Sequence, residues 1–504
     1  MFKNQPKGLL AAALANMGER FGFYTMMAIL ALFLSAKFGL SGGQAGIIYS
    51  IFYFSIYVLA FLGGIIADRT KNYKGTILVG LILMSLGYFL IAIPTGTPVP
   101  ANKFILFLAI TCLGLFTIAF GNGLFKGNLQ ALVGQMYDNP EYSKMRDSGF
   151  QWFYMFINVG AVFAPIAAVG VRNWWVARSG FVYNSDLPKL CHAHLDGTIS
   201  PEAATNLQAL ASKVGYQGVD ITAFANEYLN VFTTGFHYAF AVAIGAMAIS
   251  MTIYLLNKKR FPNPADKAKS AVGVQAGEMS VAEVRQRIFA LFAVFAVVIF
   301  FWFSFHQNGL TLTFFARDYT LLKIGSLNIT AELFQSVNPF CVVFLTPIII
   351  AFFSWLRAKG IEPSTPKKIA IGMFIASLGF VVMVLGSFNV PTYNEITEMG
   401  GLPDAMRVTP WLLIGTYFIL TVAELFISPL GISFVSKVAP PQYQGMMQGL
   451  WLCATAIGNQ LLFIGAILYE HIPIWATWTI FVVACLLSMC VMLVMLKWLE
   501  RVSK

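Results

Sequence analysis

Charged residues are scarce in this chain. Asp, Glu, Lys and Arg together make up 11% of its 504 residues, whereas about 25% is usual in a soluble domain. Hydrophobic residues account for 58% of the sequence, and the mean hydropathy is +0.72. The composition therefore excludes an ordinary soluble protein and indicates a chain that crosses a membrane many times.

Several other features are missing. There is no GxxxxGK[ST] phosphate loop, so we do not expect transport driven by ATP bound to this chain. No small-residue cleavage site follows the N-terminal segment MFKNQPKG, so no cleavable signal peptide is expected. Of the six cysteines, five lie in apolar runs and Cys191 stands alone in a polar segment, so no disulfide framework is expected.

Long apolar runs recur along the whole chain. A helix needs about 20 residues to cross the hydrocarbon core of a bilayer, and each of these runs is long enough. We predict twelve spans, at 9–35, 43–67, 75–94, 102–134, 149–171, 233–256, 287–309, 334–356, 368–388, 410–434, 446–470 and 474–497. The sequence thus predicts an all-α membrane protein with twelve transmembrane helices.

The positions of the positive residues predict the orientation of the chain. If the N-terminus is cytoplasmic, 22 of the 33 Lys and Arg fall on the cytoplasmic side, nine fall outside, and Arg20 and Lys126 lie within spans. This bias follows the positive-inside rule and places both termini in the cytoplasm. It also explains the net charge of +11 without a nucleic-acid partner.

Six spans, a basic linker and six more spans divide the chain into two halves. We predict an N-terminal bundle at 1–256, a cytoplasmic linker at 257–286 and a C-terminal bundle at 287–504. Secondary transporters often hold a central site between two such halves.

The N-terminal half includes a polar extracytoplasmic segment at about 173–232, which we call the insertion. We expect short helices in it at 201–214 and 221–232, and a passive role rather than a protein contact. Its Cys-His-Ala-His run, 191–194, offers three ligands on one short loop, which is weak evidence for metal, and we predict no metal site.

Charged residues inside transmembrane segments are functional candidates, because burying an unpaired charge in lipid is costly. Few charged or titratable residues lie inside the predicted spans, and the candidates are Glu19, Arg20, Lys126, His306 and Glu424. One interpretation is a structural ion-pair network that holds the helices together. The other is a water-filled central cavity with a cationic and an anionic side.

In the cavity interpretation, Arg20 and Lys126 would bind a carboxylate and Glu424 would bind an ammonium group. Neutral hydrogen-bonding residues complete the candidate lining, namely Tyr24, Tyr57, Tyr154, Asn158, Asn338 and Ser428. The pairs Asn338-Pro339 and Ser428-Pro429 are expected to interrupt helices at mid-span, as hinges or as static kinks. A ligand with a carboxylate and an amine at opposite ends would fit.

Seven short motifs carry a resemblance to a known family. They are ERFGFY (19–24), GGIIADR (63–69), GNGLFKGN (121–128), FYMFINVGA (153–161), SVNP (336–339), ELFISPLGISFVSKVAP (424–440) and GLWLCATAIGN (449–459). In this order they resemble the proton-dependent oligopeptide transporters, a branch of the major facilitator superfamily. The resemblance covers nearly all spans and misses mainly the insertion and the linker.

The resemblance implies the major facilitator fold, with twelve helices in two six-helix bundles, and import of di- and tripeptides by alternating access across a bacterial inner membrane. It implies that Arg20 and Lys126 face the peptide carboxylate and that Glu424 faces the amino terminus. Lys126 and Glu424 would also pair when the cytoplasmic gate closes. The resemblance also implies that the peptide backbone is held by Tyr24, Tyr57, Tyr154, Asn158 and Asn338. Trp451 would shape a side-chain pocket, and the family's loop motif would include Gly64, Asp68 and Arg69.

Three positions depart from the family pattern. Asn16 replaces a family glutamate, Met27 replaces an arginine and His306 replaces an acid. The last two form an ion pair at the outer gate of the family, and keeping only one partner would strand a charge at a cost of roughly 3–5 kcal/mol. We therefore expect an outer gate closed by packing and hydrogen bonds instead of that pair.

The departures also bear on the coupling ion. His306 is either a neutral hydrogen-bonding gate residue or a proton carrier. As a proton carrier it would be charged when protonated, whereas the family acid is charged when deprotonated. Lys126 is a further gating candidate, and Glu19 and Glu424 remain candidate proton sites. We expect proton coupling with altered pH dependence and no cofactor.

Other functions remain open. The same fold would also suit a carrier of another zwitterion or organic anion, or a proton-independent peptide facilitator. A non-transporting membrane peptide sensor is the alternative from another class. No nucleophile–base or metal constellation suggests an enzyme. The expected partners are short peptides and membrane lipid, with no obligate protein partner and no nucleic acid.

Overall fold

The computed structural model describes residues 5–136, 141–142, 146–262, 280–440 and 444–503. A few side chains within these ranges, including those of Asp68 and Pro429, also lie outside the description. Much of the predicted linker, 263–279, is among the residues that are not described.

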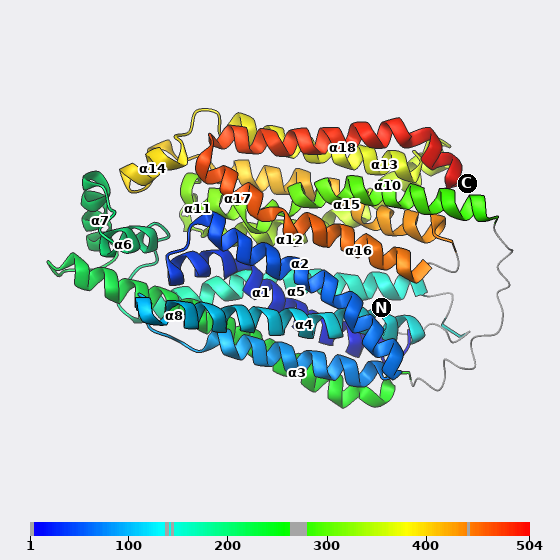
Figure 1. Cartoon of the computed structure of the whole chain (residues 1–504), viewed down its shortest axis with the longest axis horizontal. Helices are drawn as coiled ribbons and strands as arrows, with labels where there is room; N and C mark the ends of the chain where they lie inside the picture. The colour runs from blue at the N-terminus through cyan, green and yellow to red at the C-terminus, as the bar shows by residue number, and fades with distance from the viewer. Residues whose placement is uncertain (1–4, 137–140, 143–145, 263–279, 441–443, 504) are drawn as a thin grey trace.

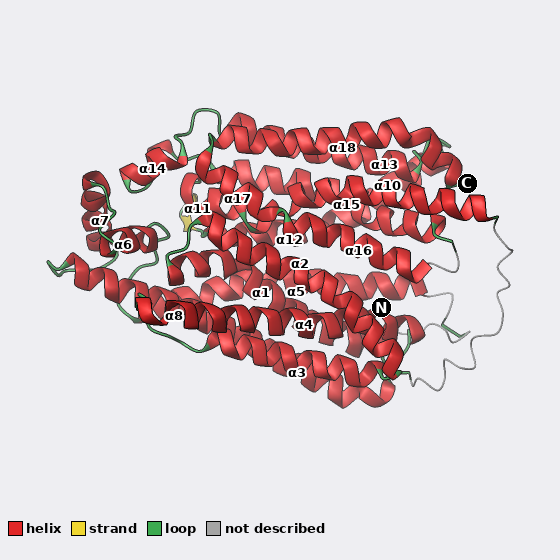
Figure 2. Cartoon of the chain, viewed as in Figure 1, coloured by secondary structure: helices red, strands yellow, loops and turns green. Residues whose placement is uncertain are grey.

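Helices make up nearly all of the described structure (Figure 2). The α-helices are α1 (Leu9–Phe38), α2 (Gly42–Thr70), α3 (Tyr73–Ala92), α4 (Phe104–Met136), α5 (Arg146–Arg178), α6 (Leu187–Leu195), α7 (Pro201–Lys213), α8 (Ile221–Asn257), α10 (Val281–Phe305), α11 (Thr311–Tyr319), α12 (Val337–Ala358), α13 (Thr365–Gly386), α14 (Tyr393–Met399), α15 (Pro410–Val438), α16 (Gln444–Gln460), α17 (Leu462–His471) and α18 (Ile474–Val502). The 3-10 helices are η1 (Ala101–Lys103), η3 (Lys258–Arg260), η5 (His306–Gly309), η6 (Ala331–Ser336) and η7 (Asp404–Met406). One antiparallel pair of two-residue strands, β1 (Lys323–Ile324) and β2 (Leu327–Asn328), completes the list.

Twelve candidate membrane spans occur among the described residues, and each corresponds to one of the predicted spans. The prediction of an all-α protein with twelve transmembrane helices is confirmed. The sixth span begins earlier than predicted, because the segment 221–232 forms the first turns of α8 instead of a separate helix. Asp220 caps that helix by accepting hydrogen bonds from the N–H groups of Thr222 and Ala223 at 2.9 and 3.0 Å.

The helices pack in two groups (Figure 1). Helices α1 to α5 and α8 pack chiefly on one another, and so do α10, α12, α13, α15, α16 and α18. Between the groups, α2 packs against α16 and α17, and α5 packs against η6 and α12. The residue boundaries predicted for the two bundles and the linker stay a prediction.

The molecule has two distinct ends (Figure 1). Both chain termini lie at one end, which we call the termini end, and α6, α7 and α14 lie at the other, the insertion end. Helix α7 confirms the short helix predicted at 201–214. It begins as expected, because Ser200 accepts a hydrogen bond from the N–H of Ala203 and Pro201 occupies the first turn.

The histidines of the 191–194 run face separate partners. The Nε2 atom of His192 lies 2.8 Å from the carbonyl oxygen of Ala36, and that of His194 lies 3.0 Å from the hydroxyl of Thr222. Cys191 is buried. Among the described residues, no group of three or more His, Cys, Asp or Glu is placed to hold a metal ion.

The structure corrects one expectation about proline. Pro339 lies in the first turn of α12, directly after η6, and so begins a helix instead of interrupting one at mid-span. A proline costs little there, because the N–H groups of a first turn have no intrahelical partner. Pro165 in α5 and Pro347 in α12 lie inside helices. Ser428 and Pro429 fall within α15, and the side chain of Pro429 lies outside the description.

Candidate functional site

A cavity of about 340 Å³ lies between the two groups of helices. This volume is within the range of about 300–1,000 Å³ that small-molecule sites occupy. All ten residues predicted to bind substrate line it, namely Arg20, Tyr24, Tyr57, Lys126, Tyr154, Asn158, Asn338, Glu424, Ser428 and Trp451. The fold therefore brings together residues from α1, α2, α4, α5, α12, α15 and α16, while their role in binding stays a prediction.

Glu19 and Arg20 form a buried ion pair on α1. The Nε and NH2 atoms of Arg20 donate to the two carboxylate oxygens of Glu19 at 2.5 and 2.7 Å. Asn122 of α4 donates to Glu19 as well, at 2.6 Å, and the guanidinium lies 4.7 Å from the ring centre of Phe23. Arg20 lines the cavity and Glu19 is fully buried behind it. Glu19 thus holds Arg20 in place and offsets its charge.

Lys126 lies on a wall of tyrosines. Its ammonium group is 4.5 Å from the ring centre of Tyr57. The rings of Tyr49, Tyr53 and Tyr57 follow one another along α2 at 6.0 and 5.9 Å. Sequence reasoning selected only Tyr57, although the spacing of four residues places all three on one helix face. The missed signal was this spacing.

Glu424 forms the anionic side of the cavity. Asn338, in the first turn of α12, donates to the Glu424 carboxylate at 2.8 Å and to the hydroxyl of Thr421 at 2.9 Å. Among the described side chains, no ion pair joins Lys126 to Glu424. The cavity therefore keeps its cationic and anionic sides apart.

His306 is packed among aromatic rings. Its Nδ1 atom is 2.5 Å from the Oδ1 atom of Asn459, and its ring stacks on Trp302 with ring centres 4.8 Å apart. The ring centre of Tyr53 lies 5.0 Å away on another side. Met27 also lines the cavity and is buried. The pair of positions that carries opposite charges in the family is therefore apolar and hydrogen-bonded here.

The cavity is open toward the termini end. Gln130 and Tyr154, which lie in the termini-end halves of α4 and α5, are exposed. Met27, Tyr49 and His306, which line the cavity nearer the insertion end, are buried. The accessible route to the cavity therefore leads from the termini end.

The insertion end is closed by contacts between the two groups of helices. The backbone N–H groups of Gly42 and Gly43, at the start of α2, donate to the Glu470 carboxylate of α17 at 2.6 and 3.2 Å. Arg172 of α5 forms a fully buried ion pair with Glu332 of η6. Packing and hydrogen bonds were expected at this end, and the ion pair was not foreseen.

The loop motif lies at the termini end of α2. Gly64 has open space around it, Arg69 is exposed, and the side chain of Asp68 lies outside the description. The close approach is made by Gly63, where a Cβ would meet the carbonyl oxygen of Gly123 at 2.2 Å. The packing of α2 against α4 therefore requires a glycine at position 63, and the role of Gly64 in the loop motif stays a prediction.

Twelve spans around a charge-lined central cavity define the class of the protein, which is a membrane carrier. The chain matches the model of the POT family over residues 74–276 and 267–475, more than half of its length, and it belongs to that family. The POT family consists of transporters in the major facilitator superfamily, so the chain is not an enzyme.

Curated relatives match over most of their length. "Dipeptide and tripeptide permease B" of Xenorhabdus bovienii is 27% identical over 99% of this chain and 97% of its own. "Peptide transporter YePEPT" of Yersinia enterocolitica is 28% identical over 91% and 87%. The "uncharacterized transporter YclF" of Bacillus subtilis is 26% identical over 94% and 90%.

Solved structures share the fold. A peptide transporter POT in complex with sulfate superposes with a TM-score of 0.73 at 22% identity, covering 100% of this chain and 96% of that one. A POT family transporter in complex with 5-aminolevulinic acid gives a TM-score of 0.72 at 20% identity, covering 100% and 98%. At this identity the likeness concerns the fold alone.

Proposed function

We propose that the protein imports di- and tripeptides by alternating access, with the proton as the coupling ion. The observation that carries the proposal is the cavity itself, with Arg20 and Lys126 on one wall and Glu424 on another. Every short peptide carries a carboxylate and an ammonium group at opposite ends, so recognition of the termini suits broad specificity. Two relatives with similar sequences carry names that refer to peptide transport.

The proposal assigns a role to each wall of the cavity. Arg20 and Lys126 bind the peptide carboxylate, and Glu424, positioned by Asn338, binds the amino terminus. Tyr24, Tyr57, Tyr154, Asn158 and Asn338 hold the backbone, Ser428 adds a hydroxyl, and Trp451 shapes a side-chain pocket.

We place the protein in the cytoplasmic membrane of a bacterium, with the insertion end outside and both termini in the cytoplasm. The basic residues on the predicted cytoplasmic side support this orientation. The open cavity then faces the cytoplasm, and pairing of Lys126 with Glu424 is the contact expected when that side closes.

Glu19 and Glu424 are the proposed proton sites. Each is the acidic member of a polar cluster in or behind the cavity wall, with Arg20 and Asn338 respectively. His306 is better suited to a neutral gate role, because aromatic rings enclose it and its Nδ1 atom is already bound to Asn459.

Another zwitterion is the second candidate for the substrate. A solved POT family structure of the same fold is in complex with 5-aminolevulinic acid. The two charged walls would also suit such a molecule, since it has an amine and a carboxylate. The binding test below therefore includes it.

Competition binding tests the assigned ends. A labelled dipeptide is displaced from the purified protein by the unlabelled dipeptide, its amide, its N-acetyl form and 5-aminolevulinic acid. Each blocked peptide is expected to bind at least about tenfold more weakly than the free peptide, a loss of about 1.4 kcal/mol. Equal displacement by free and blocked peptides would contradict the proposal.

Single variants test which charged residue of the cavity recognises each end of the peptide. Glu424→Gln should reduce discrimination against the N-acetyl form, and Lys126→Ala should reduce discrimination against the amide. Arg178→Gln removes an exposed cation of α5 outside the cavity and serves as the control. Displacement of the label at lower concentrations of 5-aminolevulinic acid than of the unlabelled dipeptide would favour the second candidate.

A further inference from the structure

One charged pair at the closed end lies outside the cavity. Arg172 of α5 forms an ion pair with Glu332 of η6, and neither side chain has exposed surface. The pair joins the N-terminal group of helices to the C-terminal group. Desolvating two charges costs about as much as their attraction returns, so such a pair is weak evidence for general stability. Its place between two groups that separate in alternating access suggests a role in the cycle.

The two partners are held unequally. The Nε and NH2 atoms of Arg172 also donate to the side chain of Asn173 at 3.1 and 3.0 Å, and its guanidinium lies 3.9 Å from the ring centre of Tyr183. The second carboxylate oxygen of Glu332 has no hydrogen-bond partner among the described residues. If the groups separate, Arg172 keeps its other contacts, and Glu332 loses Arg172.

The segment that carries Glu332 makes further contacts across the same interface. Gln335 donates to a backbone carbonyl of α1 at 3.3 Å, and Ser336 donates to one of α5 at 2.9 Å. Gln335 also lines the cavity, and Asn338 follows it on the same segment and binds Glu424. A short stretch of chain thus runs from the buried ion pair to the anionic side of the cavity.

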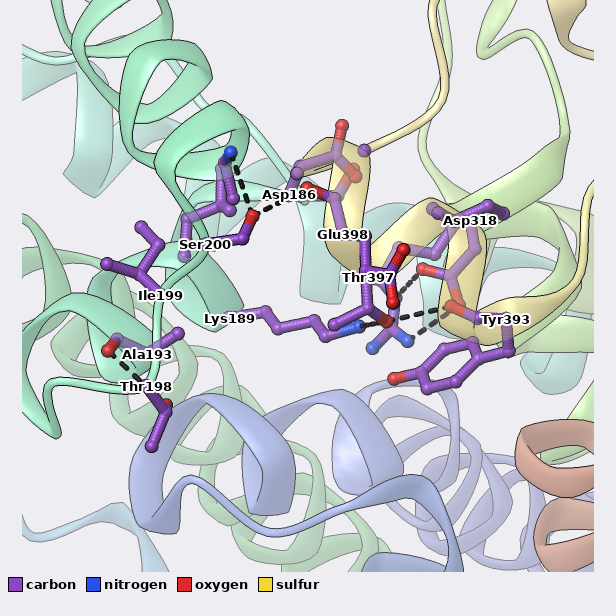
Figure 3. A pocket seen from close by; sticks show the side chains of 17 residues that line it. Asp186, Lys189, Ala193, Thr198, Ile199, Ser200, Asp318, Tyr393, Thr397 and Glu398 are labelled. Atoms are coloured by element: carbon purple, nitrogen blue, oxygen red, sulfur yellow. Dashed lines mark hydrogen bonds and ion pairs between the residues drawn. The ribbon is translucent and has the colours of Figure 1, made fainter.

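The insertion adds contacts that bridge to the segment between α13 and α15, around a small pocket at this end (Figure 3). Lys189 donates to Thr397 at 2.7 Å, and Ser200 donates to the carbonyl oxygen of Glu398 at 2.6 Å. Asp186 pairs with Arg407 at 2.8 Å. The Arg172–Glu332 pair differs from these contacts because both of its charges are fully buried.

We propose that Arg172 and Glu332 form the ion pair that holds the insertion end of the carrier closed, a role that rests on the transport cycle proposed above. The pair takes the place of the gate charges that are absent at Met27 and His306. Opening toward the outside separates η6 from α5, and water entering from that side then hydrates Glu332. The insertion contacts break in the same step.

Accessibility of the cavity from the insertion side tests this proposal. The reporter is Met27→Cys, which lines the cavity near its closed end, and the probe is a membrane-impermeant maleimide added outside. Adding Glu332→Gln or Arg172→Met to the reporter chain leaves the other charge of the pair buried and unpaired in the closed state. In the open state water hydrates that charge, so the change destabilises the closed state only. Either change is therefore expected to raise the labelling rate at least about tenfold.

A matched control separates gate opening from general loosening. Lys368 pairs with Glu362 and lies 4.2 Å from the ring centre of Phe353, so it is also a cation held by a carboxylate and a ring, but within one group of helices. Lys368→Met should leave the labelling rate unchanged. The double variant Arg172→Met/Glu332→Leu lacks the pair but strands no charge, so it should label faster than the reporter chain and more slowly than either single variant.

Unchanged labelling in both single variants, or an equal rise in the Lys368→Met control, would overturn the proposal. Glu332→Asp is the milder variant if a single variant does not fold, and it should also label faster. Labelling requires no peptide, so the result stands even if the protein fails to bind dipeptides. Failure of the gate and failure of the proposed function are therefore distinguishable.

Discussion

Arg20 reaches the cavity with its charge already paired. Glu19 binds two of its nitrogen atoms, and Asn122 fixes Glu19 from the neighbouring helix α4. Lys126 instead rests on the ring of Tyr57, a weaker contact that a ligand carboxylate can replace. The two cations therefore contribute differently, one as a fixed element of the wall and the other as an adaptable one.

Removing the charge of Glu19 should destabilise the protein. Glu19→Gln leaves the Arg20 guanidinium without its counter-charge in a buried site, at a cost of roughly 3–5 kcal/mol. The partly exposed pair of Glu283 with Arg287, four residues apart on α10, supplies the control, because Glu283→Gln should cost only about 0.3–0.5 kcal/mol. Thermal unfolding in detergent measures both, and equal shifts of the midpoint would contradict the assigned role of Glu19.

Removing the titratable ring of His306 should leave the pH dependence of uptake unchanged. His306→Gln keeps a hydrogen bond to Asn459, so we expect uptake within about twofold of the original. His306→Phe keeps the stack on Trp302 and loses that hydrogen bond, so its uptake should fall further. The measurement is initial uptake rate against external pH. A changed profile in His306→Gln would show that the ring carries the proton.

Sequence reasoning located the charged residues of the cavity because intramembrane charges are rare and stand out, whereas Trp451 was predicted only from the family resemblance. It could not locate partners that only the tertiary structure brings together, such as Asn459 for His306. Arg172 was missed for a local reason. The fifth span was predicted to end at residue 171, whereas α5 continues to Arg178. An apolar run predicts where the chain crosses the membrane, but the hydrogen-bonded helix can continue beyond the end of that run.

At the scale of helices, the number of spans followed from hydrophobicity, and their ends did not. Helix α8 begins at Ile221 because Asp220 caps it there, well before the apolar run starts. Pro339 lies in the first turn of α12, which follows η6 directly, instead of bending a helix at mid-span. Both differences place polar segments of the chain at the insertion end, where the contacts between the two groups of helices are made.

Cysteine labelling should reveal the orientation of the two ends. Val219 in the insertion and Val281 at the start of α10 are both highly exposed, on opposite ends of the molecule. In intact cells an impermeant maleimide should label Val219→Cys, and it should label Val281→Cys only after permeabilisation. Cys191 is fully buried, and burial raises the pKa of its thiol to about 12, so it should stay unlabelled. The reverse pattern would contradict the proposed topology.

At the scale of the whole molecule, the two groups of helices meet at the insertion end and leave the cavity accessible from the other. Alternating access requires the contacts of Glu470, Glu332 and the insertion to break while new contacts form around Lys126 and Glu424. A ligand whose carboxylate pairs with Lys126 and whose ammonium group pairs with Glu424 would reduce the desolvation cost of closing over the two charges. Substrate binding and gate movement are thus linked through the same residues.

Uptake of a labelled dipeptide into liposomes that contain the purified protein tests the central claim most directly. It is measured with and without an inward proton gradient, with valinomycin and potassium holding the membrane potential at zero. We predict concentrative uptake only when the gradient is present. Equal uptake in both conditions that ends at equilibration would contradict proton coupling, and the absence of dipeptide uptake in either would contradict peptide transport itself.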